Sequence, residues 1–80
     1  MTAITGRQRI IDVIREEIQK YAGRPFANDE DLIRDVNLNG DDLTAAALSI
    51  EEKLGVKIER SRYRTIRNVD EFADVISEAV

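Results

Sequence analysis

The stretch with the densest set of potential metal-binding side chains lies near the middle of the chain. Oxygen-bearing side chains occupy alternate positions there, those of Asp35, Asn37, Asn39 and Asp41. Together with Gly40, this order resembles the first half of an EF-hand calcium loop. The second half departs from it, because Ala46 stands where the loop needs a bidentate glutamate. A small calcium-binding module using residues 35–41 is therefore an alternative, and our main expectation is that no metal binds.

Groups for covalent or acid–base catalysis are few. The chain contains neither cysteine nor histidine, which excludes thiol nucleophiles, disulfides and imidazole chemistry. No histidine can therefore activate the serines, which are Ser49, Ser61 and Ser77. Asp41 and Asp42 are adjacent, so on a helix their side chains point in different directions and form no carboxylate pair. We expect that the protein is not an enzyme.

Charge is segregated along the chain, although the net charge is only −4. Residues 29–52 contain eight acidic residues and one arginine, whereas residues 53–67 contain six basic residues and one glutamate. Such segregation can steer a partner of complementary charge, or it can reflect two solvated faces. A basic cluster with one tyrosine could also grip nucleic acid. Because that cluster is short and the chain is acidic, we expect no nucleic-acid partner.

The first helix is predicted over residues 6–22. Apolar residues fall at helical spacing, with Val13 beside a stripe of Ile10, Ile11, Ile14, Ile18 and Tyr21. Thr5 is a candidate N-cap, and Gly23 is placed to end the helix in a left-handed conformation. Pro25 forbids its continuation.

Residues 23–40 are predicted to form a long connection that packs on the core. It is too apolar for a free linker, because it contains Phe26, Leu32, Ile33, Val36 and Leu38. Asn28 is a candidate cap for a short turn over residues 29–34.

The second helix is predicted to start at Asp41 or Asp42 and to stop at Gly55. Leu48 lies at the edge of its buried stripe, which comprises Leu43, Ala46, Ala47, Ile50 and Leu54. Val56 and Ile58 alternate with Lys57, but no second strand exists to pair with them. We expect an extended loop there.

Two further helical segments follow. Ser61 is predicted to cap a short turn over residues 62–66, with Tyr63 and Ile66 pointing inward. The last helix is predicted to start at Asn68 or Asp70, with an apolar face of Val69, Phe72, Ala73, Val75, Ile76 and Ala79. The chain is thus expected to be a single all-α domain over residues 1–80, a bundle of three main helices and one short helix.

Targeting and membrane signals are absent from the sequence. No apolar run approaches the roughly 18 residues that a membrane span needs. Residues 1–6 lack the basic segment and apolar run that begin a signal peptide. We therefore expect a cytoplasmic protein, and we expect it to be a monomer.

Several segments resemble the acyl carrier protein family. Asp35-Val36 is similar to the Asp-Leu that precedes the family's attachment corner, and Glu51 to Ile58 resembles its Glu-Glu-x-Phe-Gly-Ile-x-Ile. Apolar residues continue the match up to the last helix, at Ile66, Val69, Phe72 and Ile76. The two patterns run together without a gap over residues 28–77. The resemblance implies a carrier fold: a long first helix, a long loop, an acidic second helix, a very short third and a final fourth.

The resemblance breaks at the position that carries the family's chemistry. Carriers attach 4′-phosphopantetheine to the serine of Asp-Ser-Leu at the start of the second helix. In the ungapped register that serine falls on Gly40, with Asn39 and Asp41 beside it. A gapped register would place Asp42 there, but it rotates the helical stripe by about 200°. Neither residue has a hydroxyl, so no 4′-phosphopantetheine and no other cofactor is expected. The Gly-Asp-Asp triplet is also similar to that of a group of carrier-like bacterial proteins.

The expected function is therefore that of an acyl carrier protein-like domain that acts through protein–protein contacts. The resemblance implies acyl-transfer or synthase enzymes as partners. The predicted partner-binding residues are Asp41, Asp42, Glu51, Glu52, Arg60, Arg62, Arg64 and Arg67. Ala45 stands where the family usually has an acidic residue, so the second helix has fewer acidic side chains for binding partner enzymes than is usual in the family. A second alternative is a carrier of fatty acid or polyketide synthesis whose attachment serine has been substituted.

Overall fold

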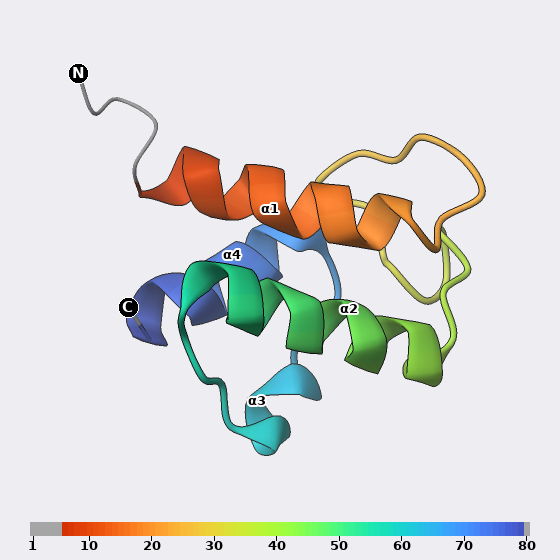
Figure 1. Cartoon of the computed structure of the whole chain (residues 1–80). Helices are drawn as coiled ribbons and strands as arrows, with labels where there is room; N and C mark the ends of the chain where they lie inside the picture. The colour runs from red at the N-terminus through yellow and green to blue at the C-terminus, as the bar shows by residue number, and fades with distance from the viewer. Residues whose placement is uncertain (1–5, 80) are drawn as a thin grey trace.

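The computed structural model describes residues 6–79, and this part of the chain contains four helices and no strand (Figure 1). They are α1 (Arg7–Gln19), α2 (Gly40–Leu54), α3 (Arg60–Tyr63) and α4 (Val69–Ala79). A long loop of residues 20–39 joins α1 to α2. The predicted all-α bundle of three main helices and one short helix is confirmed. No helix within residues 6–79 has the length and apolarity that a membrane crossing requires.

The core lies where α1 packs against both α2 and α4. Its fully buried side chains come from all three helices and from the long loop, and include Ile14, Ile18, Leu32, Ile50, Phe72 and Ile76. The apolar stripes predicted for α2 and α4 face this core, although Leu43 and Leu54 are only half-buried and Ala79 is exposed. Burial of such aliphatic and aromatic side chains is the main favourable contribution to folding.

α1 is shorter than predicted, because it ends at Gln19. The backbone N–H groups of Lys20 and Tyr21 donate to carbonyls three residues earlier, at 3.3 and 2.9 Å, which tightens the last turn. The predicted left-handed cap at Gly23 is wrong, since only Gly6 and Gly55 among the glycines have positive φ. Tyr21 is 40% exposed, so the buried stripe ends at Ile18. The predicted N-cap Thr5 lies outside the described residues.

The loop of residues 20–39 is anchored as predicted by buried Phe26, Leu32, Val36 and Leu38. Ile33 was expected to join them but is 45% exposed. The predicted cap at Asn28 is also wrong. Its side-chain oxygen accepts a 2.7 Å hydrogen bond from Arg15, whose guanidinium also lies 4.6 Å from the centre of the Phe26 ring. Asp31 makes the turn instead, since its Oδ1 accepts from the N–H groups of residues 33 and 34.

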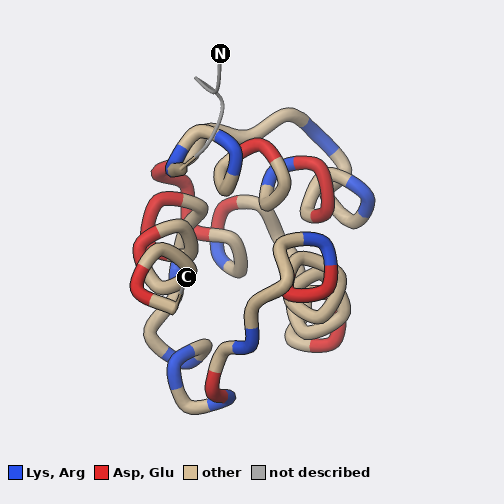
Figure 2. Tube along the Cα trace, turned by 60° about the vertical axis from the view of Figure 1, so that its left-hand side comes forward, with Lys and Arg blue, Asp and Glu red and all other residues tan. Residues whose placement is uncertain are grey.

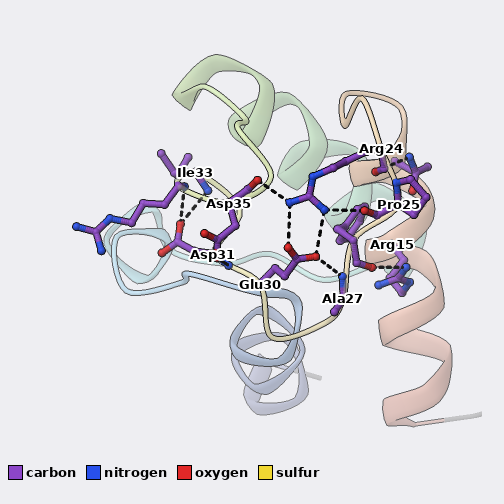
Figure 3. Close-up of polar contacts among 11 residues, drawn as sticks. Arg15, Arg24, Pro25, Ala27, Glu30, Asp31, Ile33 and Asp35 are labelled. Carbon is purple, nitrogen blue, oxygen red and sulfur yellow. Dashed lines mark hydrogen bonds and ion pairs between the residues drawn. The ribbon is translucent and has the colours of Figure 1, made fainter.

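A polar network around Arg24 holds the loop in its path (Figure 3). Its guanidinium pairs with Glu30 at 2.9 Å and donates to the Asp35 carbonyl at 2.6 Å. Glu30 also accepts from the Ala27 N–H, and these partners, Arg24 above all, lower the pKa of its carboxyl. The Leu32 N–H reaches the Arg67 carbonyl at 2.8 Å, which ties the loop to the segment before α4. The loop thus delivers the chain to the start of α2 along a defined path.

α2 begins at Gly40, one residue before Asp41 and two before Asp42, the two predicted starts. Asn39 is its N-cap, because its side-chain oxygen accepts the Asp42 N–H at 2.8 Å. Gly55 ends the helix with φ 69°, as predicted for a left-handed cap. The extended loop predicted over Val56 and Ile58 is confirmed.

α3 and α4 complete the fold. The predicted cap at Ser61 is wrong, since Ser61 lies inside α3 and Glu59 precedes the helix. Ile66 is buried and Tyr63 is half-buried, so both point inward as predicted. Asn68 caps α4 by accepting the Glu71 N–H at 2.8 Å, which confirms one of the two predicted starts.

Candidate functional site

A groove of about 490 Å³ lies between α2 and the segment containing α3. Figure 1 shows α3 below α2, on the side away from α1. The groove is lined by Gly40, Leu43, Thr44, Ala47, Leu48, Glu51, Lys57, Ile58, Arg60, Tyr63 and Arg64. Its volume falls within the range of ligand-binding clefts.

The groove combines an apolar floor with one exposed apolar rim. Ala47 and Ile58 are buried in the floor, and the small Ala47 side chain leaves space above it. Leu48 is 61% exposed, more than any other large apolar side chain of the described residues. Leu48 therefore places an exposed apolar side chain directly beside the groove.

Tyr63 fixes the far wall of the groove against α2. Its hydroxyl donates to a carboxylate oxygen of Glu51, and its ring packs edge-on against Phe72 with the centroids 5.8 Å apart. Burial, together with the hydrogen bond to the Glu51 carboxylate, raises the pKa of Tyr63 above its usual value. Arg62 pairs with Glu78 of α4 at 2.5 Å. A helix of four residues has no independent stability, so these contacts are what position α3.

The groove includes only some of the residues predicted to bind partners. Only Glu51, Arg60 and Arg64 line the groove. Arg62 is turned toward α4, and the backbone of Arg67 is used in contacts with Leu32 and Glu71. Figure 2 shows basic residues around α3 and acidic residues along α2 and α4. The acids of α2 outside the groove are Asp41, Asp42 and Glu52.

Of the four candidate calcium ligands, Asp35, Asn37, Asn39 and Asp41, two use their side-chain oxygens on backbone N–H groups. Asp35 accepts the Asp31 N–H at 3.0 Å, and the Asn39 oxygen caps α2. Asn37 has φ 73°, a left-handed conformation that asparagine tolerates better than most residues. Within residues 6–79 no three or more His, Cys, Asp or Glu side chains are grouped so that they could hold a metal ion.

Gly40 lies at one end of the groove, as the first residue of α2. A Cβ atom built on it would meet nothing within 4 Å, so the position has room for a side chain. Asp42, the equivalent of the attachment serine in the gapped register, does not line the groove. The ungapped register therefore brings the position of the attachment serine to the groove, and the gapped register does not.

Glu17 is a buried charged residue that the sequence analysis missed. Its side chain is 2% exposed and its carboxylate lies 2.6 Å from the Lys53 ammonium and 3.1 Å from that of Lys20. The hydrogen bond from Lys53 lowers the pKa of Glu17 and outweighs the effect of burial. The sequence spacing could have indicated that Glu17 is buried, because it lies four residues after Val13 and therefore on the apolar stripe of α1.

Comparison of the chain with protein-family models, with curated proteins and with solved structures finds no match in any of the three. The resemblance to acyl carrier proteins therefore stays a prediction.

Proposed function

We propose that the chain is an acyl carrier protein-like domain of the cytoplasm that works as a monomer through protein–protein contacts and carries no covalent arm. The observation that carries this proposal is the place of Gly40. It is the first residue of α2 and lines one end of the groove toward α3. The resemblance implies that carriers hold their 4′-phosphopantetheine on a serine at this position.

Because Gly40 has no hydroxyl, 4′-phosphopantetheine cannot be attached at this position. The first hydroxyl-bearing residue of α2 is Thr44, about 6 Å further along the helix axis at 1.5 Å per residue. Asn39 and Asp41 also replace the residues that flank the serine in the family. What remains of a carrier is the fold, the long loop that leads to α2 and the groove. These features support a domain that meets acyl-transfer or synthase enzymes without presenting a cargo.

The mass of the chain after incubation with a phosphopantetheinyl transferase and coenzyme A tests the proposal. The native chain is expected to keep its mass. Asn39→Asp/Gly40→Ser/Asp41→Leu, which restores Asp-Ser-Leu, is expected to gain one phosphopantetheine group, because residue 40 has room for the serine side chain. Gly40→Ala is the matched control, since it adds a Cβ without a hydroxyl, and it is expected to stay unmodified.

Two outcomes contradict the proposal. Modification of the native chain would mean that it carries an arm, and peptide fragmentation would then show whether Thr44 holds it. A triple variant that keeps the native circular dichroism and thermal stability but stays unmodified would mean that the likeness to carriers is wrong. The second alternative, a carrier of fatty acid or polyketide synthesis whose attachment serine is substituted, predicts in addition that the modified variant accepts an acyl group from such a synthase.

A further inference from the structure

We propose that the groove between α2 and α3 binds an amphipathic helix of a partner protein, and that carboxylates line the edge of that helix facing α3. This inference rests on the proposed function, in which the domain acts through protein contacts, and it names the chemistry of the partner.

The shape of the groove suits a helix laid lengthwise. Both Gly40 and Glu51 line it, so it follows α2 for about 16 Å at 1.5 Å per residue. That length matches about three turns of a partner helix. Leu48 stands on the rim and Ala47 leaves depth in the floor, which is the arrangement that receives leucine side chains spaced at i, i+3 and i+7.

The wall formed by α3 is positively charged. Arg60, the first residue of α3, and Arg64, which follows the helix, line it four residues apart, and Lys57 lines it from the loop before α3. All three are exposed, and none takes part in an ion pair formed within residues 6–79. Glu51 is the one acidic residue among those lining the groove, and its carboxylate already accepts the Tyr63 hydroxyl. Carboxylates on a partner would therefore meet basic groups along this wall.

The rim of the groove on the α2 side is negatively charged, whereas the α3 side is positively charged. A partner helix that fits both sides must therefore carry different charges on its two edges. Successive residues of a helix turn by about 100°, so Asp41 and Glu52 lie on α2 beyond Leu48 and outside the groove. They would repel carboxylates on the partner's other edge. The partner helix is therefore acidic on one edge and neutral or basic on the other.

A designed peptide is the probe. It carries leucines at i, i+3, i+7 and i+11, glutamates along one edge and glutamines along the other. The control peptide has glutamine in place of each glutamate. Amide NMR titration of the ¹⁵N-labelled full chain reports both the affinity and the surface that binds.

The acidic peptide is expected to shift the amides of the groove with a dissociation constant below about 1 mM. The neutral peptide is expected to bind about tenfold more weakly, the fold-change of two or three exposed ion pairs. Arg60→Gln/Arg64→Gln is expected to remove this difference between the peptides. Arg9→Gln/Arg34→Gln, the matched control, removes two exposed arginines outside the groove and is expected to keep it.

Equal affinity for the two peptides, shifts on another surface, or no saturable binding would overturn the inference. Saturation of the groove by decanoate without binding of either peptide would also overturn it, because the groove would then be a small-molecule site. The phosphopantetheine mass measurement does not depend on any peptide. Failure here and failure of the proposed function can therefore be told apart.

Discussion

The two sides of α2 are held in different ways. Toward α1, Ala46 and Ile50 are completely buried, and Lys53 closes the end of the interface on Glu17 at 2.6 Å. Toward α3, Leu48 is exposed, and Arg60 and Arg64 make no ion pair within residues 6–79. The same helix therefore buries one face in the core and leaves the other partly exposed to solvent. Substitutions that separate the two faces test this division.

The largest expected effect comes from the core face. Ile50→Ala should lower the free energy of unfolding by about 2–5 kcal/mol, because it removes a buried side chain and leaves a cavity. Leu48→Ala, two residues away on the other face, should change it by less than about 0.5 kcal/mol. Urea unfolding followed by circular dichroism measures both. Similar losses for the two variants would show that the faces are not distinct.

The buried ion pair should come next. Glu17→Gln leaves Lys53 without its buried partner and is expected to cost about 1–3 kcal/mol, less than a fully buried pair because Lys53 is 43% exposed. Glu16→Gln is the matched control, since Glu16 also pairs with Lys53 but is 66% exposed, and its loss should be much smaller. The urea midpoints of the two variants measure these losses of stability. Equal losses would mean that the burial of Glu17 adds nothing to the stability that its ion pair provides.

The same pair makes stability depend on pH. The pKa of folded Glu17 lies below its ordinary value of 4.5, so the unfolded chain binds more protons near that pH. The ionised Glu17 carboxylate therefore stabilises the folded chain fully when the pH is above the ordinary pKa. This stabilisation is lost as the pH falls through the lower pKa that Glu17 has in the folded chain. The fall in stability on acidification should therefore be shallower in Glu17→Gln than in the native chain. Parallel curves would contradict this role.

A smaller effect is expected in the wall of the groove. Tyr63→Phe removes the hydrogen bond to Glu51 and should cost about 0.5–1.5 kcal/mol. Because α3 is short and held by few contacts, its amide hydrogens should exchange faster in the variant while those of α1 change less. Hydrogen exchange followed by NMR distinguishes the two regions. Unchanged exchange in α3 would mean that Tyr63 does not position it.

Calcium should have the smallest effect. Asp35 and Asn39 use side-chain oxygens on backbone N–H groups, and Ala46 supplies no carboxylate. An NMR titration with calcium is expected to give only weak, fast-exchange shifts over residues 35–42. Tight, saturable binding would instead favour the EF-hand-like alternative.

Local sequence patterns predicted most of the fold. The apolar stripes of α2 and α4 and the stop at Gly55 follow from helix periodicity and from the conformational freedom of glycine. The errors lie where distant contacts decide. The loop turns Ile33 outward because Arg15, Arg24 and the Arg67 carbonyl hold its path. No local pattern contains that information.

The groove was less predictable than the helices. Position 40 was identified from the resemblance, but the groove depends on tertiary contacts, including those by which Tyr63 and Arg62 hold α3 against α2 and α4. The eight residues predicted to bind partners were chosen by charge, which does not tell that Arg62 pairs with Glu78. Tertiary packing therefore separates the charged residues that line the groove from those that do not.

The intact mass of the chain after treatment with a phosphopantetheinyl transferase and coenzyme A tests the central claim most directly. If the chain is a carrier-like domain without an attached phosphopantetheine, the mass of the native chain should not change. Asn39→Asp/Gly40→Ser/Asp41→Leu should gain the mass of one phosphopantetheine group, located at residue 40. A native chain that gains this mass, or a folded triple variant that does not, would contradict it.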